Sequence, residues 1–139
     1  MDYYAVLAAA TEAEACSIAA EALESAPPGE VKLLSGPQTG MVMLRVQESV
    51  ADSQFNAGEV LVTRVQLEVA GQRGFAMVLG DAPRRALAVA LIDALIRRDD
   101  GTQAGAIMAA LLRLEARVSE RRHTKNRLIA RTTVDFETF

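Results

Sequence analysis

The chain has 139 residues, half of them hydrophobic, with a formal net charge of −3 and a single cysteine, Cys16. This length fits one domain that can bury a hydrophobic core of its own. The mildly acidic balance gives no reason to expect nucleic acid or a membrane surface as a partner. No run approaches the roughly 20 apolar residues of a membrane span. A lone cysteine and the lack of a signal-peptide pattern predict a cytoplasmic protein.

Residues 2 to about 25 have the spacing of one helix. Apolar positions recur at alternating steps of three and four, which places them on one stripe of a helix surface. Pro27 and Pro28 then end the helix. The stripe consists of Val6, Ala9, Ala13, Cys16, Ala20 and Leu23.

The middle of the chain changes to the two-residue period of strands. Alternating patterns cover residues 42–46, 61–69 and 75–79, and a shorter strand is expected at residues 31–34. Connections this short require antiparallel pairing, because a parallel crossover needs a dozen or more residues. The pattern predicts a four-stranded antiparallel meander.

Two helices are expected after the strands. Asp81 caps the first, which runs to about Arg98 and should be the most buried, since apolar residues surround it. The second starts near Ala104 and turns Ile107, Leu111, Leu114 and Val118 to the core. The final segment, residues 132–139, has an extended composition. The fold class is therefore α+β: a single domain over residues 1–139, with the meander flanked by an N-terminal helix and C-terminal helices.

No catalytic constellation is recognisable. His123 is the only histidine and lies in a highly polar stretch, so a solvated surface position is expected. No phosphate loop or nucleophile motif occurs, and no metal site is predicted. Asp93 interrupts an apolar helix, which is typical of some catalytic carboxylates. Arg97 lies four residues later, however, and favours an ordinary ion pair on one helix face.

Positive charge gathers in the C-terminal third. Seven basic and two acidic residues lie between Arg113 and Arg131, so this segment is near +5 and the remainder, given the total of −3, near −8. Such a stripe can meet phosphate or an acidic partner, or it can be a solvated helix face. On the sheet, a hairpin centred on Gln54 would place Arg45 opposite Arg64, and an anion or carboxylate would then relieve their repulsion.

Several segments, in this order, resemble the PhnG family, small subunits of the bacterial carbon–phosphorus lyase system for phosphonate breakdown. The resemblance covers the chain from about Gly36 to Phe139. The segments that carry it are Thr39-Gly40-Met41-Val42-Met43-Leu44, Phe55-Asn56-Ala57-Gly58-Glu59, Thr63-Arg64, Gly74-Phe75-Ala76, Val78-Leu79-Gly80, Ala90-Leu91-Ile92-Asp93-Ala94-Leu95 and Val134-Asp135-Phe136.

The resemblance implies an accessory subunit with PhnI, PhnH, PhnJ and PhnL as partners. The family takes part in displacing adenine from ATP by a phosphonate, which yields ribose 1-phosphonate 5-triphosphate. ATP is then a substrate of the assembled complex, and no cofactor or catalytic residue is expected on this chain. The chain alone should be inactive, and it can form a homodimer when isolated.

The candidates for partner contact or anion binding are Arg45, Phe55, Asn56, Gly58, Glu59, Thr63 and Arg64. The alternative is that the glycine serves a bulge and the phenylalanine the core. The sequence also departs from the family pattern at residues 47–54, at Asp81-Ala82 and at Arg85-Ala86-Leu87. A second hypothesis is a small anion- or nucleotide-binding regulatory module that uses Arg45, Arg64 and the basic stripe.

Overall fold

The computed structural model describes residues 2–25, 29–48, 53–98 and 103–133. Helices and strands follow one another in two blocks of helix separated by one block of strand. In chain order they are α1 (Tyr3–Ala8), α2 (Glu12–Ser25), β1 (Val31–Glu48), β2 (Ser53–Val69), β3 (Gln72–Leu79), α3 (Pro83–Arg98) and α4 (Gln103–Thr133).

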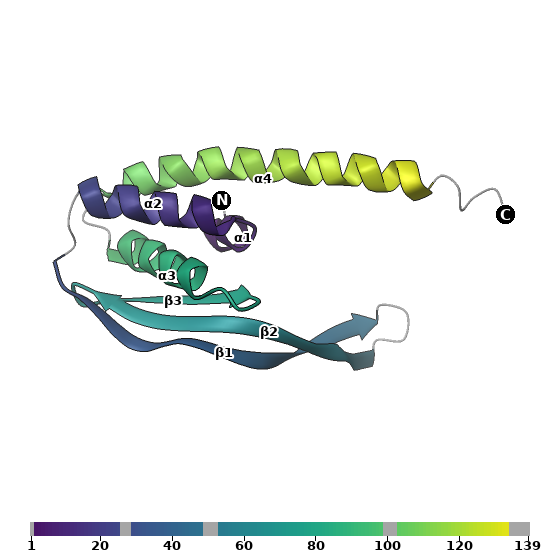
Figure 1. Cartoon of the computed structure of the whole chain (residues 1–139), viewed down its shortest axis with the longest axis horizontal. Coiled ribbons are helices and arrows are strands. Elements are labelled where there is room, and N and C mark those ends of the chain that lie inside the picture. The colour runs from purple at the N-terminus through teal and green to yellow at the C-terminus, as the bar shows by residue number, and fades with distance from the viewer. Residues whose placement is uncertain (1, 26–28, 49–52, 99–102, 134–139) are drawn as a thin grey trace.

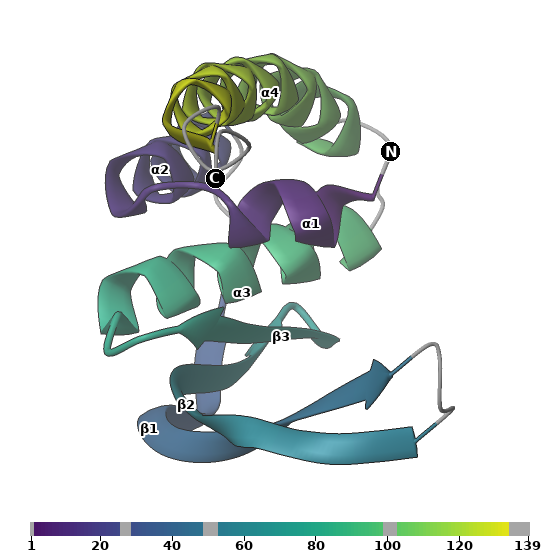
Figure 2. The same ribbon diagram turned by 90° about the vertical axis from the view of Figure 1, so that its right-hand side faces the viewer.

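The elements form three layers (Figures 1 and 2). The sheet is the lowest layer, α3 lies across one of its faces, and α1, α2 and α4 cover the other side of α3. This position explains why α3 is buried on several sides, as its apolar sequence predicts. Eight of its residues are buried: Ala86, Ala88, Val89, Ala90, Ile92, Asp93, Ala94 and Leu95.

The α+β class is confirmed, but the predicted four-stranded meander is wrong, because the sheet has three antiparallel strands in the order β1-β2-β3. The two strands expected at residues 31–34 and 42–46 are parts of one strand, β1. Gly36 and Pro37 look like a break in the sequence. In the structure β1 continues through them, and register shifts between Leu33 and Gln38 absorb the irregularity.

The predicted N-terminal helix is in fact two helices. α1 ends at Ala8 and α2 begins at Glu12. Thr11 and Glu14 form a reciprocal cap at the start of α2: the Glu14 N–H donates to Thr11 Oγ1 at 3.2 Å, and the Thr11 N–H donates to Glu14 Oε1 at 2.9 Å. The break rotates α2 relative to α1, so Ala13 and Ala20 of the predicted stripe are exposed.

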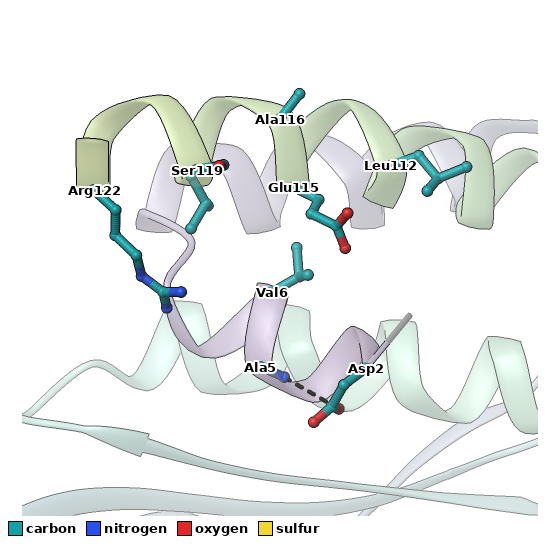
Figure 3. A pocket seen from close by; sticks show the side chains of 9 residues that line it. Asp2, Ala5, Val6, Leu112, Glu115, Ala116, Ser119 and Arg122 are labelled. Carbon is teal, nitrogen blue, oxygen red and sulfur yellow. Dashed lines mark hydrogen bonds between the residues drawn. The ribbon is translucent and has the colours of Figure 1, made fainter. Parts of the chain in front are cut away.

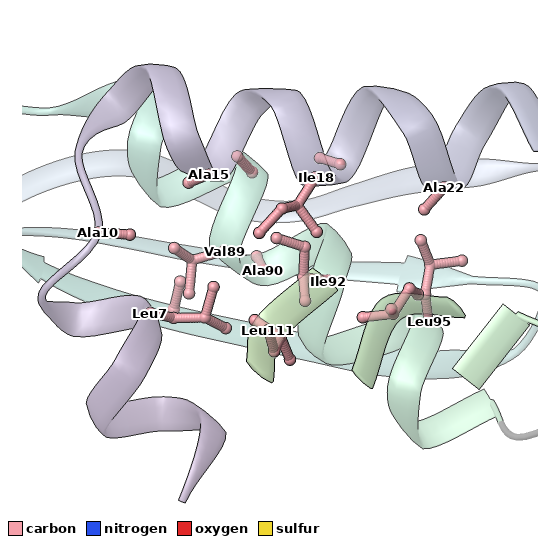
Figure 4. Packing of buried hydrophobic residues seen from close by; sticks show 14 of the residues in the cluster. Leu7, Ala10, Ala15, Ile18, Ala22, Val89, Ala90, Ile92, Leu95 and Leu111 are labelled. Carbon is pink, nitrogen blue, oxygen red and sulfur yellow. The ribbon is translucent and has the colours of Figure 1, made fainter. Parts of the chain in front are cut away.

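The core joins α3 to its neighbours in both layers (Figure 4). The predicted core face of α4 is confirmed, with Ile107, Leu111, Leu114 and Val118 all buried. Ten of the 25 buried apolar residues in the described part of the chain are alanines. Alanine contributes little buried area per residue, so this core depends on close approach of the backbones.

Gly74 shows how close that approach is. A Cβ at this position of β3 would overlap the Ala90 carbonyl oxygen and lie 2.7 Å from Ala94 Cβ. Small residues on both elements therefore let α3 lie directly on β3. Two other expectations differ from the structure. Ala82, rather than Asp81, stands immediately before the first residue of α3. In the segment that was expected to be extended, Thr132 and Thr133 belong to α4, and residues 134–139 lie outside the described residues.

In the described part of the chain, no helix combines the length and apolar character needed to cross a membrane.

Candidate partner interface

The paired strands β1 and β2 extend well past the rest of the sheet. β3 pairs only with the segment of β2 from Val62 to Val69. Residues 41–48 of β1 and 53–61 of β2 therefore form a two-stranded hairpin arm. With 16 residues, α3 is about 24 Å long, whereas a strand of 18 residues spans about 59 Å. The arm projects past the end of α3, as Figure 1 shows.

One face of the arm is apolar and exposed. Thr63 is buried beneath the helical layer, and alternation along the strands places Leu61, with its partner Met41, on the same face. Met43 follows on that face. Met41, Met43 and Leu61 are 56%, 53% and 40% exposed. Glu59, the cross-strand partner of Met43, is exposed on the same face, so the core-facing side of the sheet continues as an uncovered, mainly apolar surface that also carries the Glu59 carboxylate.

The predicted site residues lie along β2 and the facing part of β1, but their environments differ. Arg45, Gly58, Glu59 and Arg64 are exposed. Phe55 and Asn56 lie in the β2 part of the arm, and their side chains are outside the described set. Gly58 has a φ of 144°, opposite Leu44, next to a register shift. A glycine at a bulge is one of the two roles that the sequence suggests for it.

Thr63 is 1% exposed, and its hydroxyl is used inside the chain. Thr63 Oγ1 donates to the Gly80 carbonyl at 2.6 Å and accepts from the Ala82 N–H at 2.9 Å. It therefore joins β2 to the connection between β3 and α3.

The expected pairing of Arg45 with Arg64 is wrong. Arg45 lies opposite Asn56, and Arg64 lies opposite Gln38 on one side and Met77 on the other. Since Asn56 and Arg64 are separated by eight residues of β2, the two arginines are about 26 Å apart along the ladder. The expected pairing requires a hairpin centred on Gln54. In the structure the pair nearest the turn is Glu48 with Ser53, so the centre of the hairpin lies earlier in the chain. No anion is needed to relieve repulsion between them.

Among the described residues, Asp93 is the buried carboxylate, and it accepts four hydrogen bonds. Its Oδ1 accepts from the hydroxyls of Tyr3 and Tyr4 and from Arg97 Nε, and its Oδ2 accepts from the Phe75 N–H at 2.9 Å. Burial and the contacts with Tyr4 and Asp93 raise the pKa of the Tyr3 phenol far above its usual value. Hydrogen bonds to Tyr4 and Asp93 raise the pKa of the Arg97 guanidinium.

This arrangement favours a structural role for Asp93, because its carboxylate joins α1, α3 and β3 and every bond goes to the protein itself. The sequence predicts the pair with Arg97 from their spacing. The two tyrosines, which lie about 90 residues earlier in the chain, gave no such signal.

The basic stripe is partly neutralised within the chain. Arg121 Nη1 lies 2.8 Å from Glu14 Oε2, and Arg117 Nε lies 3.8 Å from the same oxygen. The hydrogen bond from Arg121, helped by those from Thr11, lowers the pKa of Glu14 to about 2. Beyond this point α4 continues without α2 beside it, and its side chains from Ser119 to Leu128 are exposed, including His123.

A hollow of about 540 Å³ lies between α1 and α4 (Figure 3). Asp2, Glu115 and Arg122 are its charged residues, and Val6, Leu112 and Val118 are among the apolar ones. Asp2 is already used as the cap of α1, where its Oδ1 accepts from the N–H groups of Tyr4 and Ala5. Ser119 adds a hydroxyl group to the lining.

Comparison with known proteins agrees with the family resemblance. The model of the family described as "Phosphonate metabolism protein PhnG" matches residues 2–139. A curated protein of Rhizobium meliloti (strain 1021) is 33% identical over 134 residues, which cover 96% of this chain and 83% of the relative. That relative is named alpha-D-ribose 1-methylphosphonate 5-triphosphate synthase subunit PhnG. The chain belongs to the PhnG family of phosphonate metabolism proteins.

Proposed function

We propose that this chain is the PhnG subunit of an alpha-D-ribose 1-methylphosphonate 5-triphosphate synthase. In this role it assists the ATP-dependent displacement of adenine by a phosphonate, in the cytoplasm, as part of a complex with PhnI-, PhnH-, PhnJ- and PhnL-type subunits. The chain contributes binding surface and the partners contribute the reacting groups.

The observation that carries the proposal is the match to a synthase subunit over 96% of the chain. One feature of the structure supports a role in assembly. The exposed apolar face of the hairpin arm is typical of a surface that another protein covers.

The structure does not bring together the arginines on which the anion- or nucleotide-binding alternative depends. Arg45 and Arg64 are far apart along the sheet, and Arg121 of the basic stripe is bonded to Glu14. Arg64 does line a hollow of about 200 Å³ with Gln38, Met41 and Met77, but it is the only charged residue of that lining. A nucleoside triphosphate carries several negative charges, so a site that binds it needs more than one cation.

Genetic complementation tests the proposal directly. A bacterial strain that lacks its own PhnG subunit should regain growth on methylphosphonate as sole phosphorus source when it expresses this chain with PhnI, PhnH, PhnJ and PhnL from the same bacterium. Growth on inorganic phosphate is the control. The isolated chain should release no adenine from ATP and methylphosphonate. Adenine release by the chain alone, or failure to co-purify with any of these subunits, would contradict the proposal.

A further inference from the structure

The two edges of the sheet are finished differently. On β3, the N–H of Phe75 donates to the buried carboxylate of Asp93 at 2.9 Å, and the carbonyl of Leu79 accepts from Arg85 Nη2 at 3.0 Å. Alternate residues of a strand turn their backbone groups to the same edge, so both side chains cap the edge that β2 does not occupy. Capping of this kind keeps other chains from pairing with an edge strand.

Arg85 also ties this cap to the helical layer. Its Nη1 donates to the carbonyls of Ala8 and Ala10, at 3.3 and 3.1 Å, where α1 passes into α2. Arg85 belongs to the segment Arg85-Ala86-Leu87, where the sequence departs from the family pattern, and it has a structural role in this chain. The β3 edge is closed from both ends by residues of α3.

The first half of β1 has an irregular edge. Gly36 and Pro37 interrupt the regular register there, and proline has no N–H to offer. From Gln38 to Leu44 the pairing with β2 is regular, and no third strand lies on the other side of β1 among the described residues. The segment from Thr39 to Leu44 contains no charged residue and no proline. Gly40, Met41 and Met43 are exposed.

A bare edge of this composition is a hazard for a protein that works alone. Six apolar or small residues in an extended strand, without charge or proline, form the kind of segment that pairs with other chains and aggregates. Proteins usually protect such an edge with lysine, proline or a covering element. The β3 edge of the same sheet has that protection, so the bare edge of β1 points to a partner.

We propose that a β-strand of a partner subunit adds to β1 along Gln38–Leu44 and extends the sheet to four strands. Main-chain hydrogen bonds supply affinity in this mode of recognition, and side-chain contacts supply specificity. The partner strand brings apolar side chains to the face that carries Met41, Met43 and Leu61. This inference rests on the proposed function, because the strand belongs to another subunit of the same synthase.

The curated relative is a subunit of a synthase, which favours a different subunit over a second copy as the occupant of this edge. α4 projects on the same side of the molecule as the hairpin arm (Figure 1). Its exposed end carries Arg122, Lys125 and Arg127. A subunit whose strand adds to β1 and that also reaches this end of α4 would meet these cations, so acidic residues beside its apolar strand would complement them.

Hydrogen exchange measures this pairing at the backbone. The chain is compared alone and in the complex co-purified from cells that express it with PhnI, PhnH, PhnJ and PhnL. We expect amides within residues 38–44 to exchange at least about tenfold more slowly in the complex, since ladder hydrogen bonds protect them. Amides of β3 should change little, which makes Gln72–Leu79 the internal reference. Unchanged exchange at residues 38–44 would overturn the inference.

A matched pair of substitutions tests the edge without unfolding the protein. Met41→Lys places a charge beside the bare edge, and Met77→Lys makes the same change on β3. The two methionines are 56% and 45% exposed, so both variants should fold. Met41→Lys should reduce recovery of the co-purified complex about tenfold, by disfavouring strand addition. Met77→Lys should leave recovery unchanged. Equal recovery of the two variants would contradict strand addition to β1.

Two results separate this inference from the proposed function. If the wild-type chain restores growth on methylphosphonate but residues 38–44 stay unprotected, the inference fails and the proposed function stands. If the wild-type chain neither restores growth nor co-purifies, the proposed function fails. Protection of residues 38–44 in the isolated chain, together with a dimeric mass in light scattering, would show that a second copy is the occupant and would overturn the choice of partner.

Discussion

The half of the sheet beneath α3 and the hairpin arm beyond it are built from the same two strands but in opposite ways. Under α3, small residues let backbones touch, and the edge of β3 is capped by Asp93 and Arg85. In the arm the same face carries methionine and leucine side chains that are about half exposed. α4 repeats the contrast, because Glu14 ties its middle to α2 while its end projects free of α2.

The part of the sheet under α3 stabilises the fold of the chain, and the hairpin arm provides a surface for binding other subunits. Substitutions in the covered half should change the free energy of unfolding, and substitutions in the arm should change assembly alone. Stability and assembly can therefore be measured separately in variants of the two regions.

The largest effect on stability is expected at Asp93. Asp93→Ala leaves the Phe75 N–H, both tyrosine hydroxyls and the Nε of Arg97 without the acceptor that they share. Loss of a buried charged partner costs about 3–5 kcal/mol of unfolding free energy. Asp81, an exposed carboxylate, is the control, and Asp81→Ala should cost less than about 0.5 kcal/mol. Urea unfolding followed by circular dichroism measures both. Equal midpoints would show that the hydrogen-bond cluster is not needed for folding.

A matched pair of glycines comes next. Gly74→Ala forces β3 away from Ala90 and Ala94 and should cost about 1–3 kcal/mol, the range for overfilling a packed core. At Gly40, on the exposed part of β1, nothing lies within 4 Å of the added methyl group. Gly40→Ala should therefore change the unfolding free energy by less than about 0.5 kcal/mol. A larger loss at Gly40 than at Gly74 would contradict the close packing of α3 on β3.

Glu14 should have a smaller effect that depends on pH. Its pKa falls from 4.5 in the unfolded reference to about 2 in the folded chain, because of Arg121 and Thr11. Because folding lowers the pKa of Glu14, this residue stabilises the folded chain fully above pH 4.5, and the stabilisation is lost as the pH falls toward 2. Glu14→Gln should cost about 1 kcal/mol at pH 7 and progressively less below pH 4.5.

Glu120, on the exposed end of α4, is the control for this titration. Glu120→Gln should change the unfolding free energy little at any pH, as is usual for an exposed carboxylate. Thermal unfolding between pH 2 and 7 compares the variants. A difference between Glu14→Gln and wild type that persists at pH 2 would show that the ion pair is not its cause.

The smallest effect on stability is expected in the arm. Met43 is 53% exposed, so Met43→Lys should change the unfolding free energy by less than about 0.5 kcal/mol. The same variant should lose most of its recovery in the co-purified complex, because the lysine disfavours coverage of the apolar face. Urea unfolding and co-purification are measured on one preparation. Loss of stability together with loss of assembly would place Met43 in the core instead.

Periodicity alone predicts much of the covered half. The core face of α4, the burial of α3 and the antiparallel order of the long strands all follow from spacing. The break in the N-terminal helix also has a local signal, because Thr11 and Glu14 have the spacing of a capping box. The continuity of β1 between residues 31–34 and 42–46 has no such signal, because register shifts absorb the irregular residues between them.

The arm could not be assigned from sequence in the same way. The position of the turn decides which residues face each other, and the expected pairing of Arg45 with Arg64 depended on a centre at Gln54. Exposure of Met41 and Met43 depends on where α3 ends above the sheet, which no local pattern reports. The partners of Asp93 include Tyr3 and Tyr4, and contacts across 90 residues leave no periodic signal.

Methionine oxidation offers the most direct test of the central claim, that the hairpin arm is covered in the assembly and the β3 side of the sheet is not. Met41, Met43 and Met77 are all about half exposed in the isolated chain, so peroxide should oxidise them at similar rates. In the co-purified complex, Met41 and Met43 should become protected while Met77 reacts as before. Unchanged oxidation of Met41 and Met43, or protection of Met77 alone, would contradict the account.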